Sequence, residues 1–406
     1  MINLVEKSND KINGTIELNS SKSESNRVLI IQALTNEDFK INNLSNSDDT
    51  KTLIELLNSH SEILDVGPAG TTLRFLISYL AVKNNSVKTL TGSKRMLERP
   101  VKDLVTALKD LDAHIEYLEK SGYPPLKISG KALTKNEVNI SGTTSSQYIT
   151  SLMLIAPTLN NGLKINIIGK IASKPYINMT LKLLNYFGVS AHWESSSIIV
   201  PHQNYQAKDY TIEGDWSAAS YLYELLAFAK SGEITINGLK KDSLQGDSVI
   251  ALIMQNFGIN TEYFENSIKI TKNNLITDYF EYDFSDCPDI AQTIAVVCAG
   301  LNIRAKLTGL ESLKIKETDR VKALITELSK LGADISETEN NVIAIKPVDS
   351  GLHKNILINT YKDHRMAMSF TPLALICNSI QIEEPEVVKK SYPDFWNDLS
   401  KLGIMF

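Results

Sequence analysis

The strongest constraint on the fold is a pattern of strand, turn, polar loop and helix that recurs along the whole chain. Glycine or asparagine ends the strand in most copies, as in INNLSNSDDTKTLIELL and LTGLESLKIKETDRVKALITEL. Such self-similarity indicates a molecule assembled from related supersecondary modules. Five clear copies and a degenerate sixth begin at residues 41, 90, 167, 236, 307 and 382.

A second series is interleaved with the first and consists of a strand, a short polar turn and a strongly apolar helix. Because these helices are hydrophobic on nearly all sides, we expect them to be buried. Together the two series predict six βαβαββ-like modules. The 406 residues exceed the size at which one core stops growing, so two closed domains of three modules fit better than an open solenoid. The six copies begin at residues 15, 63, 138, 210, 282 and 356.

The arginines concentrate where a loop leads into a predicted helix. Only seven of the 42 Lys and Arg residues are arginines, and six of the seven lie in such polar motifs. A helix N-terminus offers free N–H groups and a positive dipole end, and guanidinium binds carboxylate or phosphate with two parallel bonds. If these helix ends converge, they form a site for polyanions. The six are Arg27, Arg74, Arg95, Arg99, Arg320 and Arg365; only Arg304 lies elsewhere.

The charge, the cysteine content and the distribution of apolar residues argue against several classes of function. A net charge of −5 argues against a nucleic-acid partner, which requires a basic face. The three cysteines have no CxxC spacing, which fits a reducing cytoplasm and argues against a zinc site. The N-terminal residues lack the apolar run of a signal peptide, and no uncharged apolar stretch reaches the roughly 20 residues of a membrane span. We therefore expect a cytoplasmic protein with no membrane partner.

The stretch VGPAGTTLRFL, residues 66–76, has the glycines of an anion-binding loop. It is not a Walker loop, because GxxxxGK[ST] requires a lysine that is missing here. As the second copy of the strand–turn–helix series, it is predicted to hold an anion at a helix start.

Ten motifs then carry a resemblance to a known family. They are SSKSESNRVLI, VGPAGTTLRFL, GSKRMLERP, GTTSSQYITSLML, SKPYI, SLQGDS, CPDIAQT, IKETDR, YKDHRMAM and KKSYPDF. In order and spacing, over essentially the whole chain, they resemble the 5-enolpyruvylshikimate-3-phosphate synthases. The resemblance implies two inside-out α/β domains, each of three βαβαββ units with buried helices, and an active site in the interdomain cleft. It places an N-terminal, shikimate 3-phosphate-binding domain at 20–240. The C-terminal domain, with most catalytic residues, would comprise 1–19 and 241–406.

The implied reaction transfers the enolpyruvyl group of phosphoenolpyruvate to the 5-hydroxyl of shikimate 3-phosphate and releases phosphate. It proceeds by addition, to a tetrahedral intermediate, and then elimination. The resemblance implies no metal and no organic cofactor. The only partners implied are the two small-molecule substrates, and we expect a monomer. Glyphosate, which competes for the phosphoenolpyruvate site in this family, is expected to inhibit, because Gly70 leaves room that a side chain would fill.

Serine, lysine and arginine motifs are implied to bind shikimate 3-phosphate. Serines would hold its phosphate, and Gln147 would lie against the ring and reach phosphoenolpyruvate. Any one of these motifs alone would suit an ordinary helix cap, Ser23 to Asn26 being nearly a capping box. The implied residues are Lys22, Ser23, Arg27, Ser145, Ser146, Gln147, Ser173, Tyr176, Asp289, Ser312 and Lys316.

A second set is implied to clamp phosphoenolpyruvate. Arg320 and Arg365 would face its carboxylate, and Arg95 and Lys390 its phosphate. Lys389 beside Lys390 leaves the register ambiguous by one residue. Surface salt bridges are the simpler interpretation of any one cation. The implied residues are Lys22, Gly70, Thr71, Arg95, Gln147, Arg320, Arg365 and Lys390.

Two carboxylates are implied to move protons. Glu317 would transfer a proton at the methylene carbon, and Asp289, assisted by Lys22, would serve the 5-hydroxyl. A carboxylate near arginines normally ionises easily, so Glu317 must be partly desolvated to act as an acid. Each could instead be a salt-bridge partner. His364, next to Arg365, resembles a supporting histidine of the site.

Two positions depart from the family pattern. Pro68 and Ser312 stand where the family commonly has asparagine, so one contact to each substrate is in doubt. Proline at 68 also removes a backbone N–H from the loop.

Two alternatives remain at this stage. UDP-N-acetylglucosamine enolpyruvyl transferase shares the fold and donor, but that family usually has a catalytic cysteine near the LERP-like segment. Here no cysteine precedes Cys287, and SSKSESNR and DHRMAM favour shikimate. A non-catalytic phosphometabolite-binding protein could retain the clamp, but it would not need both Asp289 and Glu317.

Overall fold

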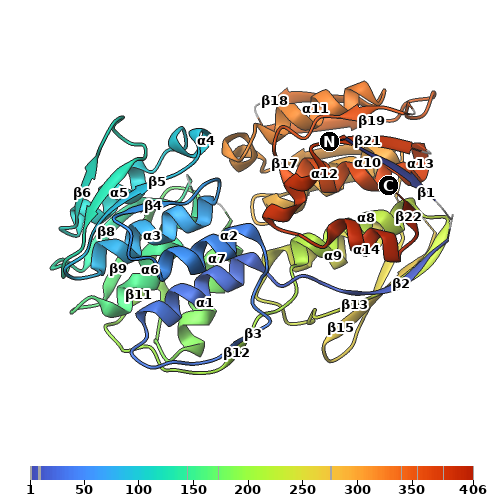
Figure 1. The fold of residues 1–406 in the computed structure, drawn as a ribbon. Coiled ribbons are helices and arrows are strands. Elements are labelled where there is room, and N and C mark those ends of the chain that lie inside the picture. Colours follow the sequence, from blue (N-terminus) through green and yellow to red (C-terminus); the bar gives the residue numbers. More distant parts are fainter. Residues whose placement is uncertain are drawn as a thin grey trace. The chain divides into compact units, whose positions relative to one another are not determined.

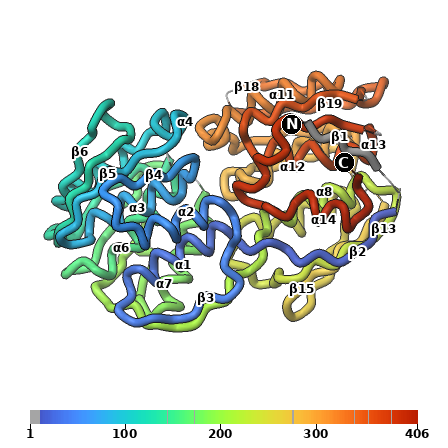
Figure 2. The backbone as a smooth tube through the Cα atoms, in the orientation of Figure 1, coloured from blue at the N-terminus to red at the C-terminus, as the bar shows by residue number. Residues whose placement is uncertain are grey.

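The chain forms two compact units, whose elements are drawn in Figure 1. Unit 1 comprises Met1–Ser20 and Glu213–Phe406, and unit 2 comprises Ser21–Ile212. Figure 2 follows the backbone through them, in colours that run from blue to red along the sequence. The computed structural model describes residues 2–7, 11–143, 145–171, 173–274, 277–339, 341–353, 355–377 and 379–405.

In unit 2 the described strands form two four-stranded sheets and one two-stranded sheet. The first has the order β4 (Ile63–Asp65), β5 (Val87–Thr91), β7 (Leu126–Ser129), β6 (His114–Tyr117). The second has the order β10 (His192–Glu194), β11 (Ser197–Val200), β9 (Leu163–Ile168), β8 (Glu137–Ser141). The third pairs β12 (Tyr210–Thr211) with β3 (Ile41–Asn42). The helices are α1 (Lys22–Leu34), α2 (Asp48–Leu57), α3 (Gly70–Val82), α4 (Lys94–Leu97), α5 (Lys102–Asp110), α6 (Ser146–Ile155) and α7 (Lys174–Tyr186).

The described strands of unit 1 form three four-stranded sheets. The first has the order β14 (Ile259–Tyr263), β15 (Ser267–Lys272), β13 (Ser231–Asn237), β2 (Lys11–Glu17). The second has the order β16 (Tyr279–Asp283), β17 (Arg304–Thr308), β19 (Val342–Lys346), β18 (Asp334–Glu339). The third has the order β20 (Leu357–Ile358), β21 (Ser379–Glu383), β1 (Ile2–Lys7), β22 (Ile404–Met405). The helices are α8 (Trp216–Phe228), α9 (Ile250–Ile253), α10 (Ala291–Gly300), α11 (Arg320–Lys330), α12 (His364–Phe370), α13 (Ala374–Cys377) and α14 (Phe395–Lys401).

Each of the six sheets contains one parallel pair of strands. A parallel pair requires a crossover connection, which is usually a helix. The apolar helices of the second sequence series supply this connection within β4–α3–β5, β8–α6–β9 and β16–α10–β17. The predicted modules are therefore visible as one sheet each, and the α/β prediction is confirmed.

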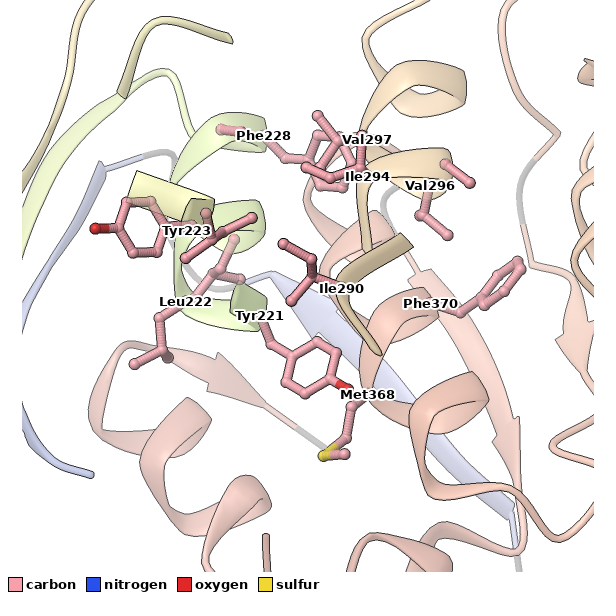
Figure 3. Packing of buried hydrophobic residues seen from close by; sticks show 14 of the residues in the cluster. Tyr221, Leu222, Tyr223, Phe228, Ile290, Ile294, Val296, Val297, Met368 and Phe370 are labelled. Carbon is pink, nitrogen blue, oxygen red and sulfur yellow. The ribbon is translucent and has the colours of Figure 1, made fainter. Parts of the chain in front are cut away.

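The connecting helices lie in the interior, as their composition predicts. Every residue of α3 from Gly70 to Ala81 is buried, and α8 and α10 are buried along nearly their whole length. Figure 3 shows the core of unit 1, where Phe228 of α8 lies beside Ile294 and Val297 of α10. Among the described residues, no helix is both long and apolar enough to cross a membrane.

The structure places the second division between the units earlier than the expected residue 240. Residues 213–240 belong to unit 1 because β13 pairs along its length with β2 and β15, and α8 packs against α10. Both divisions fall inside a repeat copy, between a strand and its helix. Strand β2 lies in unit 1 while the following α1 lies in unit 2, and β12 and α8 show the reverse arrangement.

Candidate active site

Unit 1 gathers seven charged side chains from the ends of short helices and the loops beside α10, α11 and α12. The buried Arg320, at the first position of α11, is the centre of the group. Its Nε and Nη2 donate to the two oxygens of Asp363 at 2.7 and 3.2 Å. Nη2 also donates to Glu317 Oε2 at 3.0 Å, and Nη1 to Asp289 Oδ1 at 3.2 Å. We call Asp289, Lys316, Glu317, Arg320, Asp363, Arg365 and Lys390 the anion cluster.

Three further cations close around the carboxylates of the anion cluster. Arg365 Nη2 lies 3.1 Å from Asp289 Oδ2, and Lys316 Nζ lies 3.5 Å from Asp289 Oδ1. Lys390, in the 3-10 helix η7 (Pro385–Lys390), donates to Glu317 Oε1 at 2.6 Å. Lys389 is exposed, so Lys390 is the lysine of this pair that reaches the cluster.

The residues of the anion cluster lie close to helix ends, and this position explains how they come together. Asp289 lies in the 3-10 helix η4 (Pro288–Ile290), directly before buried α10, and Lys316 follows η5 (Glu311–Ile315). Asp363 caps α12 by accepting the N–H of Arg365 at 2.9 Å. The apolar helices thus fix the backbone, and the polar residues before or at each first turn are left to meet. Ser312, in η5, is half-buried.

Burial and neighbouring charges shift several protonation equilibria around the cluster. Burial lowers the pKa of the Lys316 ammonium, against the opposing effect of Asp289. Burial alone would lower the pKa of Arg320, but Asp363, Glu317 and Asp289 raise it above its ordinary value. Burial, with the charge of Asp289, raises the pKa of Asp247 to about 7. This last carboxyl group, in η2 (Gly246–Val249), was not selected from the sequence; its motif SLQGDS was the available signal.

His364 and Tyr221 flank the anion cluster. Nδ1 of the buried His364 lies 3.6 Å from Asp363 Oδ1. The Tyr221 hydroxyl accepts a hydrogen bond from Arg365 Nη1 at 3.2 Å. Burial raises the pKa of Tyr221 to about 12, so this phenol is neutral near pH 7.

In unit 2, Arg27 of α1 is buried among helices α6 and α7. Its Nε donates to Thr180 Oγ1 at 2.8 Å, and Nη1 donates to the carbonyl of Ser23 at 2.6 Å. Nη2 donates to Thr150 Oγ1 and to the carbonyl of Tyr176, at 3.4 and 3.3 Å. Burial lowers the pKa of Arg27 to about 10. The structure therefore shows an arginine held mainly by uncharged protein groups.

The start of α1 is capped by a residue that was not among the predicted ones. Ser21, rather than Ser23, accepts the backbone N–H of Glu24, at 3.4 Å. Lys22 Nζ lies 3.5 Å from Asp49 Oδ2, a buried carboxylate in the first turn of α2. The hydroxyl of Ser23 is therefore not the cap of this helix.

Helix α6 brings two predicted residues together. Ser145 caps the helix by accepting the N–H of Gln147 at 3.3 Å, and the next residue, Ser146, is buried. Gln147 Nε2 donates to Thr71 Oγ1 of α3 at 3.2 Å.

The predicted Ser173 directly precedes helix α7. Its backbone is in the left-handed conformation, with φ of 54°.

Gly70, at the first position of α3, faces two arginines. A Cβ atom added there would lie 2.5 Å from Arg99 Nη1 and 2.9 Å from Arg74 Nη1. Arg74 Nη1 also donates to the carbonyl of Gly70 at 2.9 Å. The predicted Arg95 is 51% exposed instead, and it pairs with Glu98 at 3.2 Å. The structure thus brings Arg99, together with Arg74, to this helix start.

A repeated α/β architecture whose helix starts collect arginines, lysines and carboxylates defines a class of enzymes that handle polyanionic substrates. The profile of one family, EPSP synthase (3-phosphoshikimate 1-carboxyvinyltransferase), matches residues 6–59 and 56–399. The chain therefore belongs to the EPSP synthase family.

Individual relatives agree with this assignment. The chain is similar to the 3-phosphoshikimate 1-carboxyvinyltransferase of Bacteroides fragilis, with 46% identity over 394 residues, 97% of this chain and 96% of the relative. The protein of the same name from Colwellia psychrerythraea is 39% identical, with 97% of each chain covered. A solved EPSP synthase from Acinetobacter baumannii is similar in fold, with a TM-score of 0.80 at 18% identity, over 100% of this chain and 99% of that one.

The activity of the family is the activity of this chain. It transfers the enolpyruvyl group of phosphoenolpyruvate to shikimate 3-phosphate, in the biosynthesis of aromatic amino acids. The prediction of enolpyruvyl transfer to shikimate 3-phosphate is confirmed.

Proposed function

We propose that the two units divide the work of this reaction, with the donor and the proton transfers served mainly by the anion cluster of unit 1. The main support for this proposal is that Glu317 and Asp289 each contact at least two cations of the cluster. Four cations face three carboxylates, so the cluster has an excess of 4 − 3 = 1 positive charge. Such a site attracts a further anion while it keeps carboxylates at hand for proton transfer.

Phosphoenolpyruvate is the donor in this proposal. Arg320 and Arg365 bind its carboxylate, and Lys390 binds its phosphate. From unit 2, Lys22, Gly70, Thr71, Arg95 and Gln147 serve the donor. Arg99, which lies beside Gly70, adds a further cation for its phosphate. Glyphosate, as an analogue of the donor, is expected to compete for the same groups.

Shikimate 3-phosphate binds mainly to unit 2 in this proposal. The helix starts that carry the serines supply N–H groups and hydroxyls for its phosphate. Unit 1 contributes Asp289, Ser312 and Lys316. Because the reaction joins donor to acceptor, groups of both units must act on the same pair of substrates. The residues of unit 2 are Lys22, Ser23, Arg27, Ser145, Ser146, Gln147, Ser173 and Tyr176.

Glu317 and Asp289 carry the protons. Glu317 gives a proton to the methylene carbon while the 5-oxygen bonds to the adjacent carbon, and it takes a proton back as phosphate leaves. Asp289, assisted by Lys22, accepts the proton of the 5-hydroxyl. Arg320 and Lys390 contact Glu317, and the donor anion engages the same two cations in this proposal. His364 supports the site beside Asp363.

The proposal also includes a single-chain enzyme in the cytoplasm. All three cysteines are buried and take part in no disulfide, which supports a reducing compartment. Both units have their own core, which supports a monomer.

The test is a coupled assay of phosphate release with the intact chain. Release is expected only when shikimate 3-phosphate and phosphoenolpyruvate are both present. Glu317→Gln keeps the shape of the side chain, so we expect turnover to fall by roughly 10²- to 10⁴-fold with little change in substrate affinity. Turnover with UDP-N-acetylglucosamine, or a large affinity loss with normal turnover in Glu317→Gln, would contradict the proposal. Binding of both substrates without turnover would indicate a sensor.

A further inference from the structure

Helix α11 carries a second buried charged residue, Glu327, that does not contact the anion cluster. It lies seven residues after Arg320, about two turns along the same face of the helix. Its Oε1 accepts from the Tyr361 hydroxyl at 2.6 Å, and its Oε2 accepts from the backbone N–H of Asn359 at 3.1 Å. Lys330 Nζ donates to the two oxygens at 2.8 and 2.7 Å. The carboxylate thus ties α11 to the segment 359–361.

The segment that Glu327 holds leads into unusual backbone. Tyr361 and Lys362 have φ of 54° and 57°, in the left-handed region. Residues with bulky side chains rarely adopt this conformation, and it persists only where the surroundings hold the chain in place. On one side of this dipeptide the holding group is Glu327. On the other side it is Arg320, which binds both oxygens of Asp363.

Helix α11 therefore holds the segment 359–363 at two points. Glu327 holds Asn359 and Tyr361, and Arg320 holds Asp363 on the far side of Lys362. Asp363 follows directly and is fixed to the segment through its own N–H, which donates to the carbonyl of Thr360 at 2.9 Å. Asp363 in turn accepts the N–H of Arg365 and orients the guanidinium of Arg320. A shift of the segment is thereby passed to both arginines.

We propose that Glu327 is a positioning residue for donor binding, because it holds Asn359 and Tyr361 and so sets the places of Asp363, Arg320 and Arg365. This inference rests on the proposed role of Arg320 and Arg365 as the groups that bind the donor carboxylate. Glu327 itself touches no reacting group. Glu327 acts by fixing the conformation of a loop. The neighbours of this loop, Arg320 and Arg365, must be placed to within a fraction of an ångström.

The first test is Tyr361→Phe, which removes one hydroxyl from an exposed side chain and leaves the ring. The loop is then free to relax from its left-handed conformation. We expect kcat/KM for phosphoenolpyruvate to fall roughly tenfold, mainly through KM, since a hydrogen bond to a charged group is lost. The KM for shikimate 3-phosphate should stay within about twofold. Glu327→Gln is also expected to lower kcat/KM for phosphoenolpyruvate. If this variant does not fold, the result for Tyr361→Phe alone tests the proposal.

The rescue variant is Lys362→Gly in the Tyr361→Phe background. Glycine adopts the left-handed region without steric cost, so the loop no longer gains by leaving it. We expect the double variant to recover most of the lost kcat/KM for the donor. A merely structural role for the Tyr361 hydroxyl would not produce this recovery.

The matched control is Lys330→Gln, which removes a partner of Glu327 that does not contact the segment 359–361. It should lower thermal stability and leave the KM for phosphoenolpyruvate within about twofold, as expected for a change that spares the Tyr361 and Asn359 bonds. If Lys330→Gln raises the donor KM as much as Tyr361→Phe does, the positioning role is wrong.

Arg365→Ala, measured in parallel, separates this inference from the function on which it rests. If Arg365→Ala raises the donor KM and Tyr361→Phe does not, the positioning role of Glu327 is wrong and the donor site stands. If neither variant changes the donor KM, the assignment of the donor site is wrong and the positioning role fails with it.

Discussion

Arg95 and Arg99 lie in one short motif, but the structure gives them different surroundings. The Arg95 side chain is half exposed and paired with Glu98, an arrangement that contributes little in water. The Arg99 guanidinium lies against Gly70, at a helix start that suits an anion. At the scale of single residues, neighbours decide which of two similar cations can serve a ligand.

We predict that Arg99→Ala raises the KM for phosphoenolpyruvate by roughly 10- to 100-fold, since a hydrogen bond to a charged group contributes about 1.5–3 kcal/mol. Lys94→Ala, a change of an exposed cation in the same motif, is the matched control and should change this KM by less than about threefold. Steady-state kinetics with varied donor at saturating shikimate 3-phosphate measures both. An unchanged KM in Arg99→Ala would show that Arg99 does not bind the donor.

Residue identity predicted part of the candidate site and missed the rest for a physical reason. Glu317 and Asp289 were selected because their motifs are distinctive, and the structure brings them together in one cluster. Asp363, Arg320's strongest partner, was not selected, because in sequence it looks like an ordinary cap of the helix that follows. Arg99 was counted among the junction arginines, but nothing in the motif ranks it above Arg95.

At the scale of elements, the buried connecting helices are the feature that the sequence predicts best and that constrains mutation most. Helix α8 is buried almost throughout, yet it carries a carboxyl group, Glu224, whose oxygens have no hydrogen-bond partner among the described residues. Burial raises the pKa of Glu224 well above its ordinary value. A carboxyl group in this position is kept neutral by the fold.

This burial predicts how stability depends on pH. Above the unfolded-state pKa of about 4.3, the unfolded chain releases the Glu224 proton while the folded chain retains it, so stability falls as pH rises, by up to about 1.4 kcal/mol per pH unit. Glu224→Gln removes this contribution. We therefore expect the variant to match the wild type near pH 4 and to be more stable at pH 8.

Urea unfolding at several pH values measures this difference. Burial raises the pKa of Asp247 to about 7, so this group also lowers the stability of the folded chain as pH rises from about 4 to 7. The effect is the same in the wild type and in Glu224→Gln, so it cancels in the difference between their stabilities. Exposed Glu262 supplies the control: Glu262→Gln should leave the pH profile as it is. A Glu224→Gln profile parallel to that of the wild type would show that this carboxyl group ionises in the folded chain.

At the scale of the whole molecule, the chain crosses between the units twice. Each crossing separates a strand from the helix that follows it in the same repeat copy. Strand β2 pairs in parallel with β13, more than 200 residues later, while its own helix α1 lies in unit 2. Local pattern predicted the modules, since strand, turn and helix are adjacent in sequence. It could not place the second division, because the segment from Tyr210 to Phe228 reads as one uninterrupted copy and only long-range strand pairing separates its parts.

Unit 1 should therefore depend on the first twenty residues, whereas unit 2 is contiguous. Strand β1 lies between β21 and β22, and β2 completes a second sheet. Without them, residues 213–406 expose unpaired strand edges in two sheets and lose the apolar cover of Ile12 and Ile16. We expect this fragment alone not to unfold cooperatively, and the fragment 21–212 to do so.

A circular permutant makes this prediction sharper. Met405 pairs with Glu6, so a linker back to Ile2 runs along about four residues of β1, or roughly 13 Å. A flexible linker of about eight residues spans that distance. We expect 213–406 joined through this linker to 1–20 to show one cooperative urea transition, because every strand of unit 1 is then supplied by one chain. The same transition in 213–406 without the added segment would mean that β1 and β2 do not hold unit 1 together.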